Sequence, residues 1–79
     1  MSRPLTVAEG VWLREVGMRL RLRRVAAGDT QRSLADRAGV ATVTISHIER
    51  GADLGGVVTL VRLCRALDWS LSEPVGEAP

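Results

Sequence analysis

Three glycines divide the middle of the chain into short segments, and this division constrains the fold more than any other feature of the sequence. They are Gly28, Gly39 and Gly51. Gly39 is expected in the left-handed backbone conformation that closes a helix, because a residue without Cβ adopts it at little cost. Gly51 is expected to end the following helix in the same way. The glycines therefore predict short helices joined by a tight turn.

Apolar residues recur at three- and four-residue spacing along the chain, which predicts helices. The expected helices span residues 11–27, 31–38, 42–50 and 57–67, with a loop at 52–56. The first helix carries two apolar stripes, which are Leu13, Val16, Leu20 and Ala27 on one face and Val11, Met18, Leu22 and Val25 on another. The last helix has a core-facing stripe of Leu60, Leu63, Cys64 and Leu67. A further turn at 68–71 is expected to dock Trp69, which gives an all-α domain of four or five helices.

The chain has 79 residues, close to the lower limit for a single hydrophobic core without crosslinks. Its only cysteine, Cys64, cannot form an internal disulfide, and no Cys/His cluster has zinc-site spacing. We therefore expect a reducing compartment and no metal or cofactor. Residues 1–10 are expected to be a flexible lead-in, residues 11–72 the folded domain and residues 73–79 a disordered tail. We therefore expect no ligand-binding domain after the fold.

The basic residues are eleven in number, all arginine, and they concentrate in the first two-thirds of the chain. Residues 1–50 hold nine arginines against five acids, a balance of +4, whereas residues 51–79 hold two against four, a balance of −2. This asymmetry favours a polyanionic partner such as double-stranded DNA. The alternative is that arginine simply solvates the surface. Neither a signal peptide nor a membrane span is visible, so we expect a cytoplasmic, nucleoid-associated protein without a membrane partner.

Two short helices joined by a glycine-containing turn define the helix-turn-helix, and residues 31–50 match that unit over its whole length. Ala35 is small where the second helix must cross the first closely, and Gly39 makes the turn. The angle between the two helices is expected to be filled by Val40, Ile45 and Ile48.

From residue 17 to residue 71 the sequence resembles the Cro and phage-repressor type (XRE) family of DNA-binding domains, which have a lambda-repressor-like fold. The residues that carry the resemblance are Gly17, Leu20 and Arg24, the stretch TQRSLADRAGVATVTISHIERG at 30–51, and LVRLCRAL at 60–67. Arg23 and Asp29 stand where the family usually has an aliphatic residue. They leave open whether Arg24 or Arg23 takes the role in the ion pair described below.

Helical geometry sorts the residues of helix 42–50 by face. Because Ile45 and Ile48 point to the core, the opposite stripe is exposed, and its N-terminal end enters the major groove in a helix-turn-helix. The expected base-contacting residues are Thr42, Val43, Ser46 and His47. None of them is an arginine or glutamine reader, so sequence preference is expected to depend on thymine methyl contacts and DNA shape.

The resemblance assigns further roles. It implies that Gln31 donates to a DNA phosphate, assisted by the amide groups at the helix N-terminus. Thr44 and Arg50 are further phosphate candidates. It also implies an ion pair between Glu49 and Arg24 that fixes the angle between the first helix and the reading helix.

The predicted function is a sequence-specific transcriptional regulator, a repressor that binds a palindromic operator as a homodimer. The alternative is an antitoxin-type module that binds a partner protein such as a toxin as well as its own promoter. Either partner would use a surface formed by Leu54, Val57, Val58, Val61 and Trp69. Catalysis is not expected, because His47 has no suitably spaced second catalytic or metal-ligating group. Cys64 is expected to pack in the core.

Overall fold

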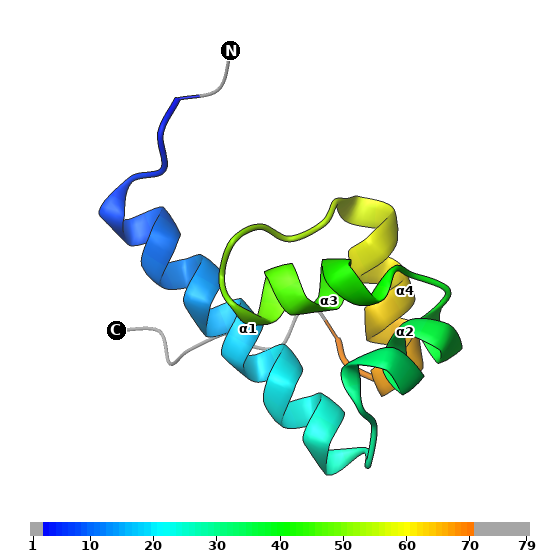
Figure 1. Cartoon of the computed structure of the whole chain (residues 1–79). Helices are drawn as coiled ribbons and strands as arrows, with labels where there is room; N and C mark the ends of the chain where they lie inside the picture. Colours follow the sequence, from blue (N-terminus) through cyan, green and yellow to red (C-terminus); the bar gives the residue numbers. More distant parts are fainter. Residues whose placement is uncertain (1–2, 71–79) are drawn as a thin grey trace.

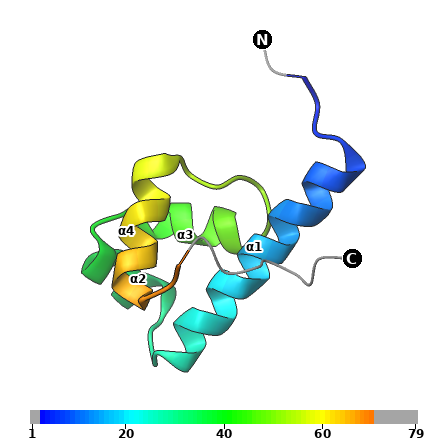
Figure 2. The same ribbon diagram turned by 180° about the vertical axis from the view of Figure 1, so that it is seen from behind.

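The computed structural model of the protein describes residues 3–70, which form four helices and no strand. The helices are α1 (Val7–Ala26), α2 (Gln31–Ala38), α3 (Thr42–Glu49) and α4 (Val57–Leu67). Figure 1 shows α3 between α1 on one side and the α2–α4 pair on the other, and Figure 2 shows the same arrangement from behind. The first turns of α1 project beyond the other helices. No helix within the described range is long and apolar enough to cross a membrane.

The start of α1 differs from the sequence prediction. Residues 7–10 were expected in a flexible lead-in, but they are helical. The cause is a capping box: the Thr6 hydroxyl accepts the Glu9 backbone N–H at 3.1 Å, and the Glu9 carboxylate accepts the Thr6 backbone N–H at 2.9 Å. Two otherwise unpaired donors are thereby satisfied, and the helix continues through Gly10. The predicted tail at 73–79 lies outside the described residues.

The other helix boundaries follow the glycines and caps. Helices α2 and α4 have the predicted limits, and α3 ends at Glu49, one residue earlier than expected. The Thr30 hydroxyl accepts the Ser33 backbone N–H at 2.9 Å, so it caps α2 as predicted. Gly39 follows α2 with a φ of 74°, in the left-handed region that was expected for it.

All four helices contribute to one hydrophobic core. Its buried members are Val16, Leu20, Leu34, Ala35, Ile45, Ile48, Leu63 and Trp69. Cys64 and Leu67, which were predicted to face the core, are half-buried and pack against it. Burial raises the pKa of the Cys64 thiol, which keeps this group in its unreactive protonated form.

Trp69 belongs to this core and not to a partner surface. Its exposed fraction is only 5%, and its backbone N–H bonds the Cys64 carbonyl at 2.8 Å just after α4 ends. The guanidinium of Arg23 lies 5.3 Å from the centroid of the indole ring, a cation–π distance. Trp69, which was expected to contribute to a dimer surface, is thus buried in this structure, with Arg23 of α1 over its ring.

Helices α1 and α3 approach each other at Gly17. A Cβ atom at this position would lie 2.2 Å from the Ile48 carbonyl oxygen and 2.9 Å from that of Glu49. Both oxygens belong to the backbone of α3, so neither can rotate away as the end of a side chain can. Gly17 thus sets the separation at which α3 packs on α1.

The close contact at Gly17 predicts that Gly17→Ala destabilises the protein by about 2 kcal/mol or more, because α1 must move away from α3. Gly10→Ala is the matched control on the same helix. A Cβ there would meet only the Arg14 side chain, at 3.7 Å, so we expect a gain of about 0.5–1 kcal/mol from helix propensity. Urea denaturation of both variants measures the difference, and equal effects would contradict this account.

Candidate nucleic-acid interface

Helices α2 and α3 are joined by residues 39–41 and form a helix-turn-helix. The backbone N–H groups of Gly39 and Val40 both bond the Ala35 carbonyl, at 2.9 and 3.0 Å, which turns the chain sharply after α2. Ala35 is buried at the crossing, as its small size predicted. Ile45 and Ile48 are fully buried, so the inward face of α3 is the predicted one.

The outward face of α3 is open at its first turn. Thr42 is exposed, and the Val43 side chain is 57% exposed. The preceding residue, Ala41, offers no side-chain cap, so the first amide groups of α3 stay available to an anion. Ser46 and His47, one turn further along, are half-buried.

The two other residues of this region that were predicted to contact phosphate differ in their surroundings. Arg50 is exposed at the end of α3, where its side chain turns back to the Ser46 carbonyl. Thr44 is half-buried under the loop that leads to α4. Its methyl group lies so close to Gly55 of this loop that a Cβ atom there would be only 2.8 Å away. The exposed Arg32, in the first turn of α2 beside Gln31, was not singled out in the sequence. Its place next to Gln31 at the start of a predicted helix is the sequence signal that could have marked it as a further candidate for phosphate contact.

The carboxylate of Glu49 connects three helices. The Arg24 guanidinium of α1 donates to both of its oxygens, from Nε to Oε2 at 2.7 Å and from Nη2 to Oε1 at 3.0 Å. The Gln31 amide of α2 donates to Oε1 at 3.1 Å. The side chains of Arg24 and Glu49 are only 12% and 5% exposed. The hydrogen bond with Glu49 raises the pKa of Arg24 further, so the guanidinium stays charged.

These contacts settle which arginine faces Glu49. Arg24 makes the ion pair and also donates from Nη1 to the Asp29 carbonyl at 2.9 Å, whereas Arg23 lies over Trp69. Gln31 is half-buried, and one hydrogen of its amide nitrogen is directed to Glu49. An amide nitrogen carries two hydrogens, so the second can still be donated to a phosphate.

Asp29 stands at a position where an aliphatic residue was expected, and its carboxylate makes polar contacts instead. It accepts from the Arg37 guanidinium at 2.5 Å and from the Ser33 hydroxyl at 2.9 Å. The hydrogen bond from Arg37 is the main reason that the pKa of Asp29 lies below its usual value. Arg37 also donates to the Ala66 carbonyl near the end of α4. The cluster therefore links the α1–α2 loop, α2 and α4.

Apart from the buried Trp69, four residues were predicted to form a partner surface. Val57, Val58 and Val61 are 77%, 64% and 38% exposed on α4. Leu54 is half-buried and packs against the core. Helix α4 is held to the turn of the helix-turn-helix by Arg62, whose Nη1 donates to the Gly39 carbonyl at 2.9 Å. In the described range, no three His, Cys, Asp or Glu side chains gather as a metal site would require.

A sequence model of a protein family, described as a helix-turn-helix domain, matches residues 15–73 of this chain. The match includes the last three turns of α1, all of α2, α3 and α4, and the residues around Glu49. No curated protein and no solved structure matches the chain significantly.

The environment of Glu49 predicts that Glu49→Ala destabilises the protein by about 3 kcal/mol, because Arg24 is left charged and nearly buried without its partner. Arg24→Ala combined with Glu49→Ala should cost less than the sum of the two single changes. Asp36→Ala removes an exposed carboxylate from α2 and is expected to change stability by less than about 0.5 kcal/mol. Urea denaturation of the four variants measures the coupling, and additive effects of Arg24 and Glu49 would contradict the prediction.

Proposed function

Because the chain belongs to the family of helix-turn-helix domains, we propose that it is a DNA-binding transcriptional regulator of the Cro and phage-repressor type, with a lambda-repressor-like domain. The observation that carries the proposal is the unit α2–turn–α3, whose outward residues Thr42 and Val43 stand exposed at the start of α3. In a helix-turn-helix this end of the second helix lies in the major groove. The proposed activity is recognition of DNA and not catalysis.

In the proposed complex, base edges are contacted from the first two turns of α3. The Val43 side chain and the methyl group of Thr42 are suited to thymine methyl groups, and the Thr42 hydroxyl to a base-edge hydrogen bond. His47 and Ser46 lie one turn deeper and are less exposed. Because none of these side chains makes a bidentate contact with guanine or adenine, DNA shape is expected to supply part of the sequence preference.

The phosphate contacts of the proposal centre on Gln31 at the N-terminus of α2, with Arg50 and Thr44 on α3 as further contacts. Gln31 is already held by Glu49, the residue that also anchors α3 to α1. A phosphate bound by Gln31 is thereby placed at a fixed offset from the base-contacting residues. This arrangement supports a positioning role for Gln31, since contacts to phosphate orient a protein on the duplex without reading its sequence.

We further propose that the regulator is a homodimeric repressor, with Val57, Val58 and Val61 of α4, flanked by Leu54, in the dimer interface. Two-fold symmetry then places two reading helices about 34 Å apart and requires a palindromic operator. The exposure of Val57 and Val58 also supports the second candidate function, an antitoxin-type module in which a toxin covers these valines. Symmetry of the preferred DNA site distinguishes the two candidates.

The roles of Gln31 and Val43 predict different effects on DNA binding. Gln31→Ala should weaken all sites alike, by about tenfold, because it removes a contact to phosphate. Val43→Ala should change which sequences are preferred. The measurement is selection from a random duplex library at two salt concentrations, followed by affinities for the selected and unselected sequences. Affinity should also fall steeply with salt.

The matched control for this experiment is Val11→Ala, which shortens an exposed valine on α1 and should leave affinity and preference unchanged. A change of preference in Gln31→Ala but not in Val43→Ala would reverse the assigned roles. Recovery of no sequence at all would remove the regulator proposal.

The dimer proposal predicts that Val58→Asp raises the dimer dissociation constant in sedimentation equilibrium by about tenfold or more, because a charge would be buried between subunits. Val11→Asp places the same charge on α1 and should leave dimerisation unchanged. A wild-type protein that stays monomeric on its palindromic site would contradict the α4 interface.

A further inference from the structure

Helix α1 has a second apolar face that points away from the rest of the protein. We call it the outer stripe, and it consists of Val11, Met18, Leu22 and Val25. Their exposed fractions are 47%, 57%, 60% and 59%. Successive helical residues are rotated by about 100°, so Met18 and the buried Leu20 point in nearly opposite directions. The outer stripe is therefore exposed within the described structure. Figures 1 and 2 show no other helix on the side of α1 that lies opposite to α3.

The outer stripe has the spacing of a helix-pairing seam. Together with Glu15 its residues are separated by four, three, four and three positions, the pattern of alternating a and d sites in a heptad repeat. The seam extends over about 21 Å of helix, which is four turns. This spacing fits another helix that lies along α1.

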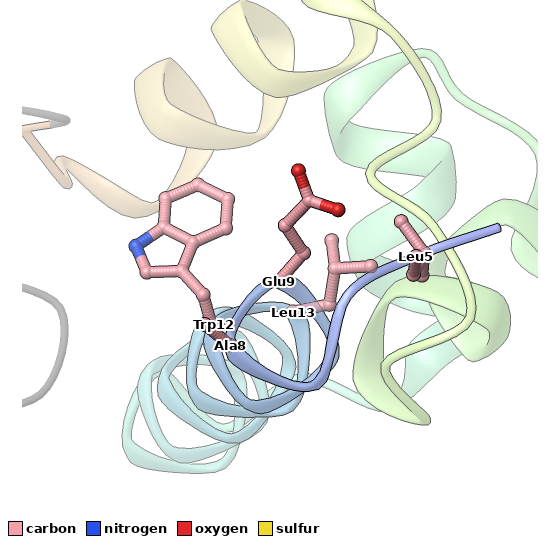
Figure 3. A pocket seen from close by; sticks show the side chains of 5 residues that line it. All are labelled: Leu5, Ala8, Glu9, Trp12 and Leu13. Carbon is pink, nitrogen blue, oxygen red and sulfur yellow. The ribbon is translucent and has the colours of Figure 1, made fainter. Parts of the chain in front are cut away.

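The first turns of α1 also line an apolar hollow, which lies on the side of the core residue Leu13 and is separate from the outer stripe. The hollow is lined by Leu5, Ala8, Glu9, Trp12 and Leu13. Figure 3 shows Trp12 and Leu5 on its two sides, with Glu9 and Leu13 between them. The Glu9 carboxylate is engaged by the Thr6 backbone N–H, and Trp12 is 49% exposed.

The charges beside the outer stripe indicate the chemistry of its occupant. Arg14 and Arg21 follow one edge of the seam and Arg19 follows the other, and none of them pairs with a carboxylate in the described part of the chain. In heptad terms Arg14 and Arg21 are g positions and Arg19 is an e position. A second copy is disfavoured in both directions, since parallel pairing brings Arg14 against Arg19 and antiparallel pairing brings the Arg14 and Arg21 edges together.

We propose that the outer stripe of α1 is a docking site for an acidic amphipathic helix of another protein. Apolar residues of that helix would cover Met18 and Leu22, and its glutamates or aspartates would pair with Arg14, Arg19 and Arg21. The site lies on the side of α1 opposite to α3, so docking leaves the reading face of α3 uncovered. The proposal does not depend on the proposed function in DNA binding.

The probe for this proposal is a labelled three-heptad peptide with leucine at a and d and glutamate at e and g. Its anisotropy is measured as full-length protein is added without DNA. We expect saturable binding. Met18→Ser with Leu22→Ser should weaken it by about tenfold or more, and so should Arg14→Glu with Arg21→Glu. The charge-reversed protein should instead bind a peptide with lysine at e and g.

A matched control makes the same charge reversal elsewhere. Arg32→Glu with Arg65→Glu reverses two exposed charges on α2 and α4 and should bind the acidic peptide within about twofold of the wild type. Circular dichroism checks that each variant is folded. The Met18 and Leu22 variant should retain its affinity for DNA, which separates this test from that of the proposed function.

Three results would overturn the proposal. One is acidic-peptide binding that the charge reversal at Arg14 and Arg21 leaves unchanged. Another is a concentration-dependent dimer in sedimentation that is lost when Met18 and Leu22 are replaced, since the occupant would then be a second copy. The third is absence of peptide binding together with binding to phosphatidylglycerol vesicles that depends on the same residues, which would assign the stripe to a membrane surface.

Discussion

The arrangement of the helices depends on the Glu49 carboxylate and the groups that donate to it. Arg24 from α1 and Gln31 from α2 both reach this one group on α3, and the ion pair is largely removed from solvent. A buried ion pair contributes little to stability compared with apolar residues of the same shape, but removing one partner is costly. Its effect is therefore to disfavour other packings of α3, so that this helix keeps one orientation relative to α1 and α2.

The glycine opposite this carboxylate allows the arrangement to be compact. Gly17 brings α1 against the carbonyl groups of Ile48 and Glu49, and this contact places Arg24, two turns along α1, within reach of the Glu49 side chain. A larger residue at position 17 would separate the helices and lengthen the bidentate contact. The polar anchor and the steric contact thus act on the same segment of α3, one through a side chain and one through the backbone.

Much of this fold was predictable, because its limits depend on local interactions. The ends of α2 and α4 follow from glycines, a threonine cap and apolar spacing. The early start of α1 is also encoded locally, in the Thr6 and Glu9 capping box. Pro4 and Gly10, however, favoured the prediction of a lead-in that is not helical. What sequence could not predict involves distant residues. The burial of Trp69 brings its ring into the shared core and under Arg23 of α1, and the bond from Gln31 to Glu49 joins two helices.

The candidate interface shows the same division. Exposure of Thr42 and Val43 follows from the helical period of α3 alone. The placement of Thr44 under the α3–α4 loop, and of Arg37 between Asp29 and α4, depends on how the loops return to the core. Only tertiary structure determines such contacts.

The bond from Arg62 to the Gly39 carbonyl has a mechanical consequence. It fastens α4 to the turn between α2 and α3, through the carbonyl group of the glycine that follows α2. In the dimer proposed to form through α4, this bond would connect the dimer interface to the turn before α3 and so help to keep the distance between the two copies of α3 constant.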